Sequence, residues 1–254
     1  MFKFRAVALA CLASLAGGAQ AAFLVTYEQP GVTSTTASFD YVGVETFNSR
    51  NAGIQTFASN FGTAGQPVVI TGQYNNVQIN TVDVYGGASN SNYAVAFSNT
   101  PYELTLLTAA GAGNTPLPVT YFGYWLSALD AGNHVAFYRG GNEVFSFNPA
   151  DVLSLTGDCP ASLYCGRPEV PFEDGNAGEP YVFLNFFDQS GLGFDRIRFF
   201  ETTGGGYESD NHTVGFYKTV TGTPVPGNEI PEPSTLALAG LAVAGLMARR
   251  RRTV

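Results

Sequence analysis

Short runs of β-branched and aromatic residues recur along residues 22–219, separated by clusters of Gly, Asn, Pro and Ser. No window of about 15 residues there shows helical periodicity. Such runs between turn-forming residues are typical of strands. The pattern predicts an all-β body, a jelly-roll-like β-sandwich of two packed sheets. Its strands are expected at residues 23–27, 38–42, 68–71, 77–84, 93–97, 102–107, 120–127, 134–139, 143–147, 181–187, 194–200 and 213–218.

Alternation of apolar and polar residues supports the strand prediction at two places. In the strand at 134–139, Val135 and Phe137 share one face, because successive side chains of a strand point to opposite sides. Arg196 and Arg198 alternate in the same way with apolar neighbours. Both strands are therefore expected to have one buried face.

Turns and two short helical segments complete the predicted body. Residues 139–143 and the triple glycine at 204–206 predict hairpin turns, since glycine adopts positive φ without strain. Helix is expected near residues 44–57 and at residues 149–154, where Asn148 precedes a proline at the first helical position and is placed to cap it.

The charge of the body excludes some partners. Hydrophobic residues make up 45% of the 254-residue chain and charged residues 13%, a composition that supports a folded core. Residues 22–230 contain six basic and 19 acidic residues, a net charge of −13. A body this acidic repels nucleic-acid phosphates and anionic lipid, so no nucleic-acid partner is expected.

The N-terminus has the organisation of a secretory signal peptide over residues 1–21. Lys3 and Arg5 precede an apolar run at residues 6–16, and small residues follow at residues 19–21. The apolar run is too short to span a membrane core of about 30 Å. Export through the Sec translocon is therefore predicted.

The C-terminal segment, residues 231–254, follows a Pro/Gly-containing linker at residues 220–230. It contains, in order, Pro231, Glu232 and Pro233, an apolar run at 236–248, and Arg249, Arg250, Arg251 and Arg252. As a helix the run covers about 20 Å, which favours a temporary membrane stop over a permanent anchor. The arginines are expected to stay on the cytoplasmic side, which leaves the body outside that membrane.

This order of motif, apolar helix and arginine cluster resembles the PEP-CTERM sorting signal of Gram-negative bacteria, which is also classified as the ice-binding protein C-terminal motif. The resemblance implies that an exosortase recognises the motif during transient inner-membrane insertion and removes the helix. The resemblance also implies that the protein then passes to the cell surface or the exopolysaccharide matrix. Ice binding does not follow from the second classification. Residues 119–133 and 204–214 also resemble exosortase-dependent surface proteins, which implies a surface location and no established chemistry.

The cysteines and histidines of the body predict a structural role. Cys159 and Cys165, six residues apart in an exported protein, predict a disulfide that staples the excursion at residues 156–180. With only His134 and His212 available besides, a zinc site is not expected. No Gly-x-Ser-x-Gly motif is present, and no catalytic residue is assigned.

A calcium site is one interpretation of the acidic stretch after the triple glycine. Glu208, Asp210 and Asn211 offer the hard oxygen ligands that Ca²⁺ prefers. Further carboxylates that would complete such a site are Asp188, Asp195, Glu173 and Asp174. The alternative is that Asp210 and Asn211 close a turn through side-chain to backbone hydrogen bonds.

Sugar stacking is one interpretation of the aromatic residues, with Trp125 and Tyr124 as the main candidates. The alternative is a core position, which is the usual place of a single Trp in an aromatic strand. The sequence therefore predicts an exported, non-enzymatic cell-surface or matrix protein that needs no cofactor. A Ca²⁺-assisted module that binds matrix polysaccharide is the first alternative, and a secreted hydrolase is a more distant one.

Overall fold

The computed structural model describes residues 23–62, 69–82, 91–109, 117–170, 173 and 175–227. As predicted, these residues are mainly strands, with one short helical segment. The strands are β1 (Phe23–Tyr27), β2 (Ser38–Glu45), β3 (Gly53–Phe61), β4 (Ile70–Asn80), β5 (Tyr93–Phe97), β6 (Tyr102–Thr108), β7 (Tyr121–Ser127), β8 (Asn133–Arg139), β9 (Asn142–Phe147), β10 (Val182–Asp188), β11 (Arg196–Glu201), β12 (Gly206–Thr219) and β13 (Thr223–Pro224). The helical segment is the 3₁₀ turn η2 (Pro149–Val152) followed by α2 (Leu153–Thr156).

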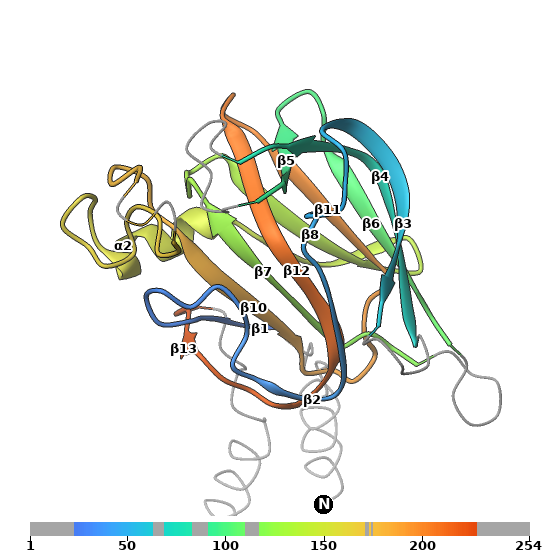
Figure 1. Cartoon of the computed structure of the whole chain (residues 1–254). Coiled ribbons are helices and arrows are strands. Elements are labelled where there is room, and N and C mark those ends of the chain that lie inside the picture. Colours follow the sequence, from blue (N-terminus) through green and yellow to red (C-terminus); the bar gives the residue numbers. More distant parts are fainter. Residues whose placement is uncertain are drawn as a thin grey trace, which may run out of the picture. The chain divides into compact units, whose positions relative to one another are not determined.

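The described strands form one curled, antiparallel sheet (Figure 1). Its order is β13-β1-β10-β7-β12-β5-β4-β6-β11-β8-β9, with β2 paired to β12 and β3 to β4. The long strand β12 pairs with β5 in its first part and β2 in its second, while β7 pairs with both parts. The register shifts between Asp210 and Thr213, where Asn211 has a φ of 51°.

Aromatic side chains join strands that are far apart in this order. Phe23 of β1 stacks on Phe145 of β9, with ring centroids 4.7 Å apart. Phe137 of β8 contacts Phe186 of β10 at 5.1 Å. Two parts of the curled sheet therefore face each other across one aromatic core, which is the layered packing expected of a sandwich. Complete burial of each such side chain contributes roughly 1.5–3 kcal/mol.

The helix predicted near residues 44–57 is wrong. Strand β2 continues to Glu45, and β3 begins at Gly53. Between them Phe47 takes a φ of 56°, and its backbone N–H donates to the Glu45 carboxylate at 2.9 Å. Burial in β3 then alternates with a period of two, because every second side chain faces the core.

The other turn and helix predictions have mixed outcomes. Gly140 and Gly141, with φ of 54° and 85°, form the predicted hairpin between β8 and β9. Asn148 caps the helical segment, as predicted, by accepting a hydrogen bond from the Ala150 N–H at 2.9 Å. The turn at 204–206 is not a hairpin, because β11 and β12 are not neighbours in the sheet. It instead carries the chain from one part of the sheet to another.

Candidate functional site

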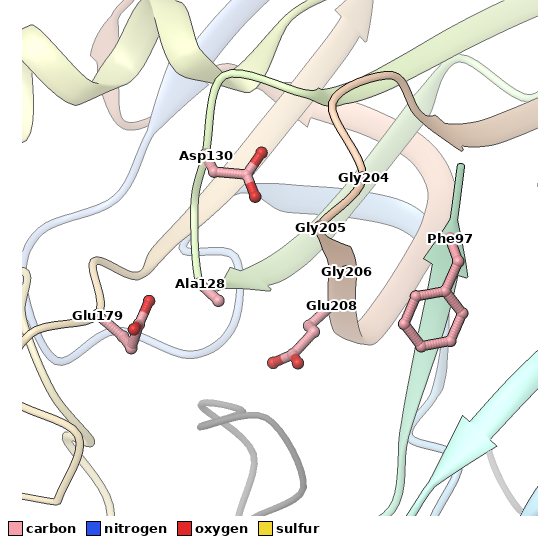
Figure 2. Close-up of a pocket in the computed structure, with 8 residues that line it drawn as sticks. All are labelled: Phe97, Ala128, Asp130, Glu179, Gly204, Gly205, Gly206 and Glu208. Carbon is pink, nitrogen blue, oxygen red and sulfur yellow. The ribbon is translucent and has the colours of Figure 1, made fainter.

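A pocket of about 300 Å³ lies where the end of β7 meets the beginning of β12. Its walls come from the β7–β8 turn, the glycine turn before β12, the end of β5 and the loop before β10. The residues that line it are Phe97, Ala128, Asp130, Glu179, Gly204, Gly205, Gly206 and Glu208 (Figure 2). Three of these side chains end in a carboxyl group and none is basic, so the lining is acidic.

Glu208 is the most buried acid of the pocket, with an exposed fraction of 1%. It lies in β12 between Val95 of β5 and Ser127 of β7. Burial and, to a smaller extent, the charge of Glu179 raise the pKa of its carboxyl, whereas Arg167 and a hydrogen bond with Ser127 oppose the rise, and together these effects place the pKa at about 8. Among the described residues, Glu208 Oε2 has no hydrogen-bond partner. The side chain is therefore mainly protonated at pH 7.

Asp130 lies on the wall formed by the β7–β8 turn. The Gly132 N–H donates to Asp130 Oδ1 at 2.7 Å. Burial raises the pKa of Asp130, although the hydrogen bond from Gly132 lowers it. A Cβ atom on Gly205 would lie 2.7 Å from Asp130 Oδ2, so glycine allows this carboxyl group to approach the turn before β12.

Glu179 supplies the exposed acid of the pocket. The Gly166 N–H donates to the Glu179 carbonyl at 2.9 Å, and Pro180 forms an isolated bridge with Cys165. The Leu129 N–H donates to the Pro180 carbonyl at 3.0 Å. The segment that carries Glu179 is thus attached both to the cysteine loop and to the end of β7.

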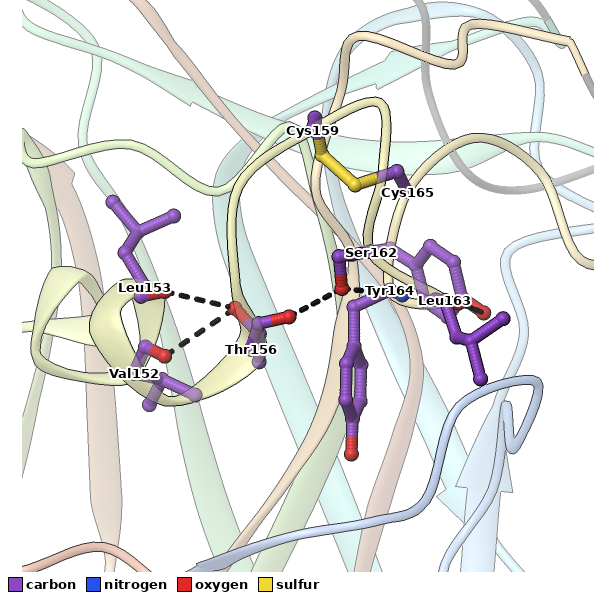
Figure 3. The surroundings of a disulfide bond; sticks show 9 residues. Val152, Leu153, Thr156, Cys159, Ser162, Leu163, Tyr164 and Cys165 are labelled. Atoms are coloured by element: carbon purple, nitrogen blue, oxygen red, sulfur yellow. Dashed lines mark hydrogen bonds between the residues drawn. A yellow bond between two sulfur atoms is a disulfide. The ribbon is translucent and has the colours of Figure 1, made fainter.

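A disulfide joins Cys159 and Cys165 in this loop, in the pairing that the spacing predicts (Figure 3). The Ser162 hydroxyl donates to the Thr156 carbonyl at the end of α2. The Tyr164 N–H donates to the Ser162 hydroxyl at 3.1 Å. These contacts close a small loop that holds the segment carrying Glu179.

The residues considered as calcium ligands all lie in strand β12, and only Glu208 reaches the pocket. Asp210 is buried, and its Oδ1 accepts a hydrogen bond from the Asn211 N–H at 2.7 Å. The Asn211 amide donates to the Thr33 carbonyl at 2.9 Å. Within the described part of the chain, no three His, Cys, Asp or Glu residues are grouped so that they could hold a metal ion.

Three of the additional carboxylates considered for that site, Asp188, Asp195 and Glu173, do not line the pocket. Asp188 forms a salt bridge with Arg139, with 3.4 Å between Oδ2 and Nη2. Asp195 accepts a hydrogen bond from the Gly140 N–H at 2.8 Å. Glu173 is exposed, and Asp174 lies outside the described residues.

Trp125 and Tyr124 are both buried, with exposed fractions of 1% and 0%. Trp125 packs with Tyr181 and Phe183 in a small cluster, and the Tyr124 hydroxyl hydrogen-bonds to the hydroxyl of Tyr207 in the main core. Strand β7 is buried along its whole length, so both rings are covered by protein. Neither is exposed for stacking on a sugar, and the core alternative is correct for both.

The two histidines also lie outside the pocket. His212 is fully buried, and its ring nitrogens hydrogen-bond to the Tyr74 hydroxyl at 3.1 Å and the Ser209 hydroxyl at 3.0 Å. Burial lowers the pKa of His212 to about 3, so the ring is neutral at physiological pH. His134 is half-buried and stacks on Phe200, with ring centroids 5.2 Å apart.

Sequence reasoning singled out Glu208 but missed Asp130, Glu179 and Phe97 as pocket residues. These residues come from separate turns and strand ends, and no motif joins them. The one local signal is an acid in the short connection that follows a strand, at Asp130. Such an acid is common in turns, so it does not identify a site alone.

The C-terminal residues 229–252 match the family model described as the PEP-CTERM protein-sorting motif. The chain carries a PEP-CTERM sorting signal. The signal marks an exported protein that is directed to the cell surface by exosortase-dependent processing. The motif, the arginine cluster and residues 1–21 lie outside the described residues. Within the described ranges, no helix has the length and apolar character needed to cross a membrane.

No curated protein matches this chain. One solved structure that the chain matches is the K2 cleaved adhesin domain of Lys-gingipain, at 14% identity over 70% of this chain and 98% of that chain, with a TM-score of 0.36. Another is the enzymatically active domain of tailspike protein 4 from bacteriophage CBA120, at 14% identity over 72% of this chain and 21% of that chain, with a TM-score of 0.29. Similarities this distant carry no argument about fold or function.

Proposed function

We propose that this protein is a non-enzymatic component of the cell surface or extracellular polysaccharide matrix of a Gram-negative bacterium. The observation that carries the proposal is the PEP-CTERM motif at residues 229–252. A sorting signal gives a destination rather than a reaction. The β body is accordingly the part that is delivered, and its structural or adhesive properties are its function.

The proposed route has three steps. The signal peptide first directs the chain through the Sec translocon. The apolar segment at 236–248 then enters the inner membrane, with the four arginines held on the cytoplasmic side. The exosortase finally acts at Pro231, Glu232 and Pro233 and releases the body.

Two features of the body support this destination. The Cys159–Cys165 disulfide is compatible with an oxidising compartment outside the cytoplasm. The net charge of −13 over residues 22–230 disfavours adsorption to nucleic acid and to anionic lipid. Both features suit a protein that remains outside the cell.

The proposal is tested by substitution of the motif in a bacterium that contains an exosortase. A variant with Pro231, Glu232 and Pro233 all changed to Ala is expected to keep its tail and remain in the inner-membrane fraction. The matched control is Pro226→Ala, an exposed proline just before the motif. The control and the native chain are expected to reach the surface. Normal surface delivery of the triple variant would contradict the proposal.

A further inference from the structure

Glu208 is difficult to explain by packing alone. It is 1% exposed, and its Oε2 atom has no hydrogen-bond partner among the described residues. A buried polar atom without a partner destabilises the folded state. Because Glu208 also lines the pocket, a ligand in the pocket can supply the missing contact.

The charges around the pocket favour a cation as that ligand. Figure 2 shows the carboxyl groups of Glu208 and Glu179 on two sides of the same space, with Asp130 on a third. None of the described side chains that line the pocket is basic. Arg167 acts on Glu208 from outside this lining and offsets only part of the negative charge.

An organic ammonium group fits these side chains better than a metal ion. Calcium takes six to eight oxygen ligands close around one point. No group of three suitable residues meets that need in the part of the chain that the structure describes. An ammonium group instead donates separate hydrogen bonds to acceptors that are spaced more widely. The volume of about 300 Å³ lies at the small end of the range for small-molecule sites.

The remaining lining suits a hydroxylated ring better than a narrow alkyl chain. The backbone of Gly204, Gly205 and Gly206 is partly exposed and carries no side chain to cover its N–H and C=O groups. Phe97 adds a partly exposed aromatic ring. We propose that the pocket binds an amino sugar, with its ammonium group against Glu208 and Glu179 and its ring beside Phe97 and the glycine turn.

Binding is coupled to loss of a proton from Glu208. An ammonium group forms a stronger hydrogen bond with a carboxylate than with a carboxylic acid. Because burial raises the pKa of Glu208 to about 8, the free site is mainly protonated at pH 6 to 7. Affinity therefore rises close to tenfold from pH 6 to pH 7, as long as the amine stays charged.

Isothermal titration calorimetry on the purified full chain tests the proposal, with glucosamine as the probe and glucose as the uncharged analogue. Glucosamine is expected to bind with the stated rise from pH 6 to pH 7, with release of close to one proton at pH 6, where the amine is fully charged, whereas glucose does not bind. Glu208→Gln is expected to weaken binding at least tenfold. The matched control Glu143→Gln, at an exposed position in β9, is expected to bind as the native chain does.

Absence of glucosamine binding to the native chain would overturn the proposal, as would equal binding of glucose. Equal binding by Glu208→Gln would overturn the role of that residue. Glu179→Gln alters an exposed side chain, so its expected several-fold loss of affinity provides a second test that does not depend on a buried substitution. The proposed amino-sugar site goes beyond the proposed function. Ligand binding is measured on purified protein, whereas surface delivery is measured in cells, so either experiment can fail without the other.

Discussion

Replacing Glu208 by Gln should stabilise the protein at neutral pH. The carboxyl group has its pKa raised from 4.5 to about 8, mainly by burial. An unfolded chain loses this proton near pH 4.5, whereas the folded chain keeps it until about pH 8. Stability is therefore lost as the pH rises between these two values. Glutamine cannot ionise, so the stability of the variant does not fall in this pH range for this reason.

The size of the effect follows from the same pKa values. By proton linkage, the raised pKa of Glu208 lowers the free energy of unfolding by about 3 kcal/mol at pH 7 and by about 1 kcal/mol at pH 5. The Gln amide also has to find hydrogen-bond partners in a buried position, which reduces the gain. We expect a net stabilisation of about 2 kcal/mol at pH 7 that largely disappears by pH 5.

Urea unfolding of the full chain at pH 5, 6, 7 and 8 measures this difference. Glu143→Gln is the control, because its exposed side chain should change the free energy of unfolding by less than about 0.5 kcal/mol. Comparison of variant and native chain at each pH removes the contributions of the other titrating groups. A Glu208→Gln variant that is less stable at pH 7, or whose effect is independent of pH, would refute the reasoning.

Three further predictions concern other parts of the body. Burial lowers the pKa of His212 to about 3, so between pH 7 and pH 5 only the unfolded chain takes up a proton at this residue, and the free energy of unfolding should fall by about 2 kcal/mol. His212→Gln should remove this pH dependence in urea unfolding. An unchanged pH dependence in the variant would contradict the prediction. Replacement of Cys159 and Cys165 by Ser should lower the free energy of unfolding by about 2 kcal/mol. An unchanged urea midpoint under non-reducing conditions would show that the disulfide does not stabilise the fold. Addition of Ca²⁺ or EDTA should leave the Tm unchanged, because no three-residue metal group exists among the described residues; a saturable rise with Ca²⁺ would show a site that this reasoning misses.

The strands could be predicted from sequence where one face is buried. In β8 and β11, apolar residues alternate with polar ones, and Val135, Phe137 and Ile197 are indeed buried. The same reasoning failed near residues 44–57, because a turn with Phe47 at positive φ interrupts two strands and leaves a mixed pattern.

The pocket could not be predicted, because it depends on contacts between distant parts of the chain. Glu208 meets Asp130 only where β12 pairs with β7. Glu179 joins them through the loop that is held by Cys165 and Pro180. The sequence separates these residues by tens of positions, and it contains no local pattern that specifies such a meeting.

The mass of the protein on the cell surface tests the central claim most directly. Intact-mass spectrometry of material released from the surface measures whether the C-terminal tail is still present. Exosortase processing predicts that the surface form lacks the apolar run at 236–248 and the arginines that follow it. A surface form that still ends at Val254 would contradict the claim.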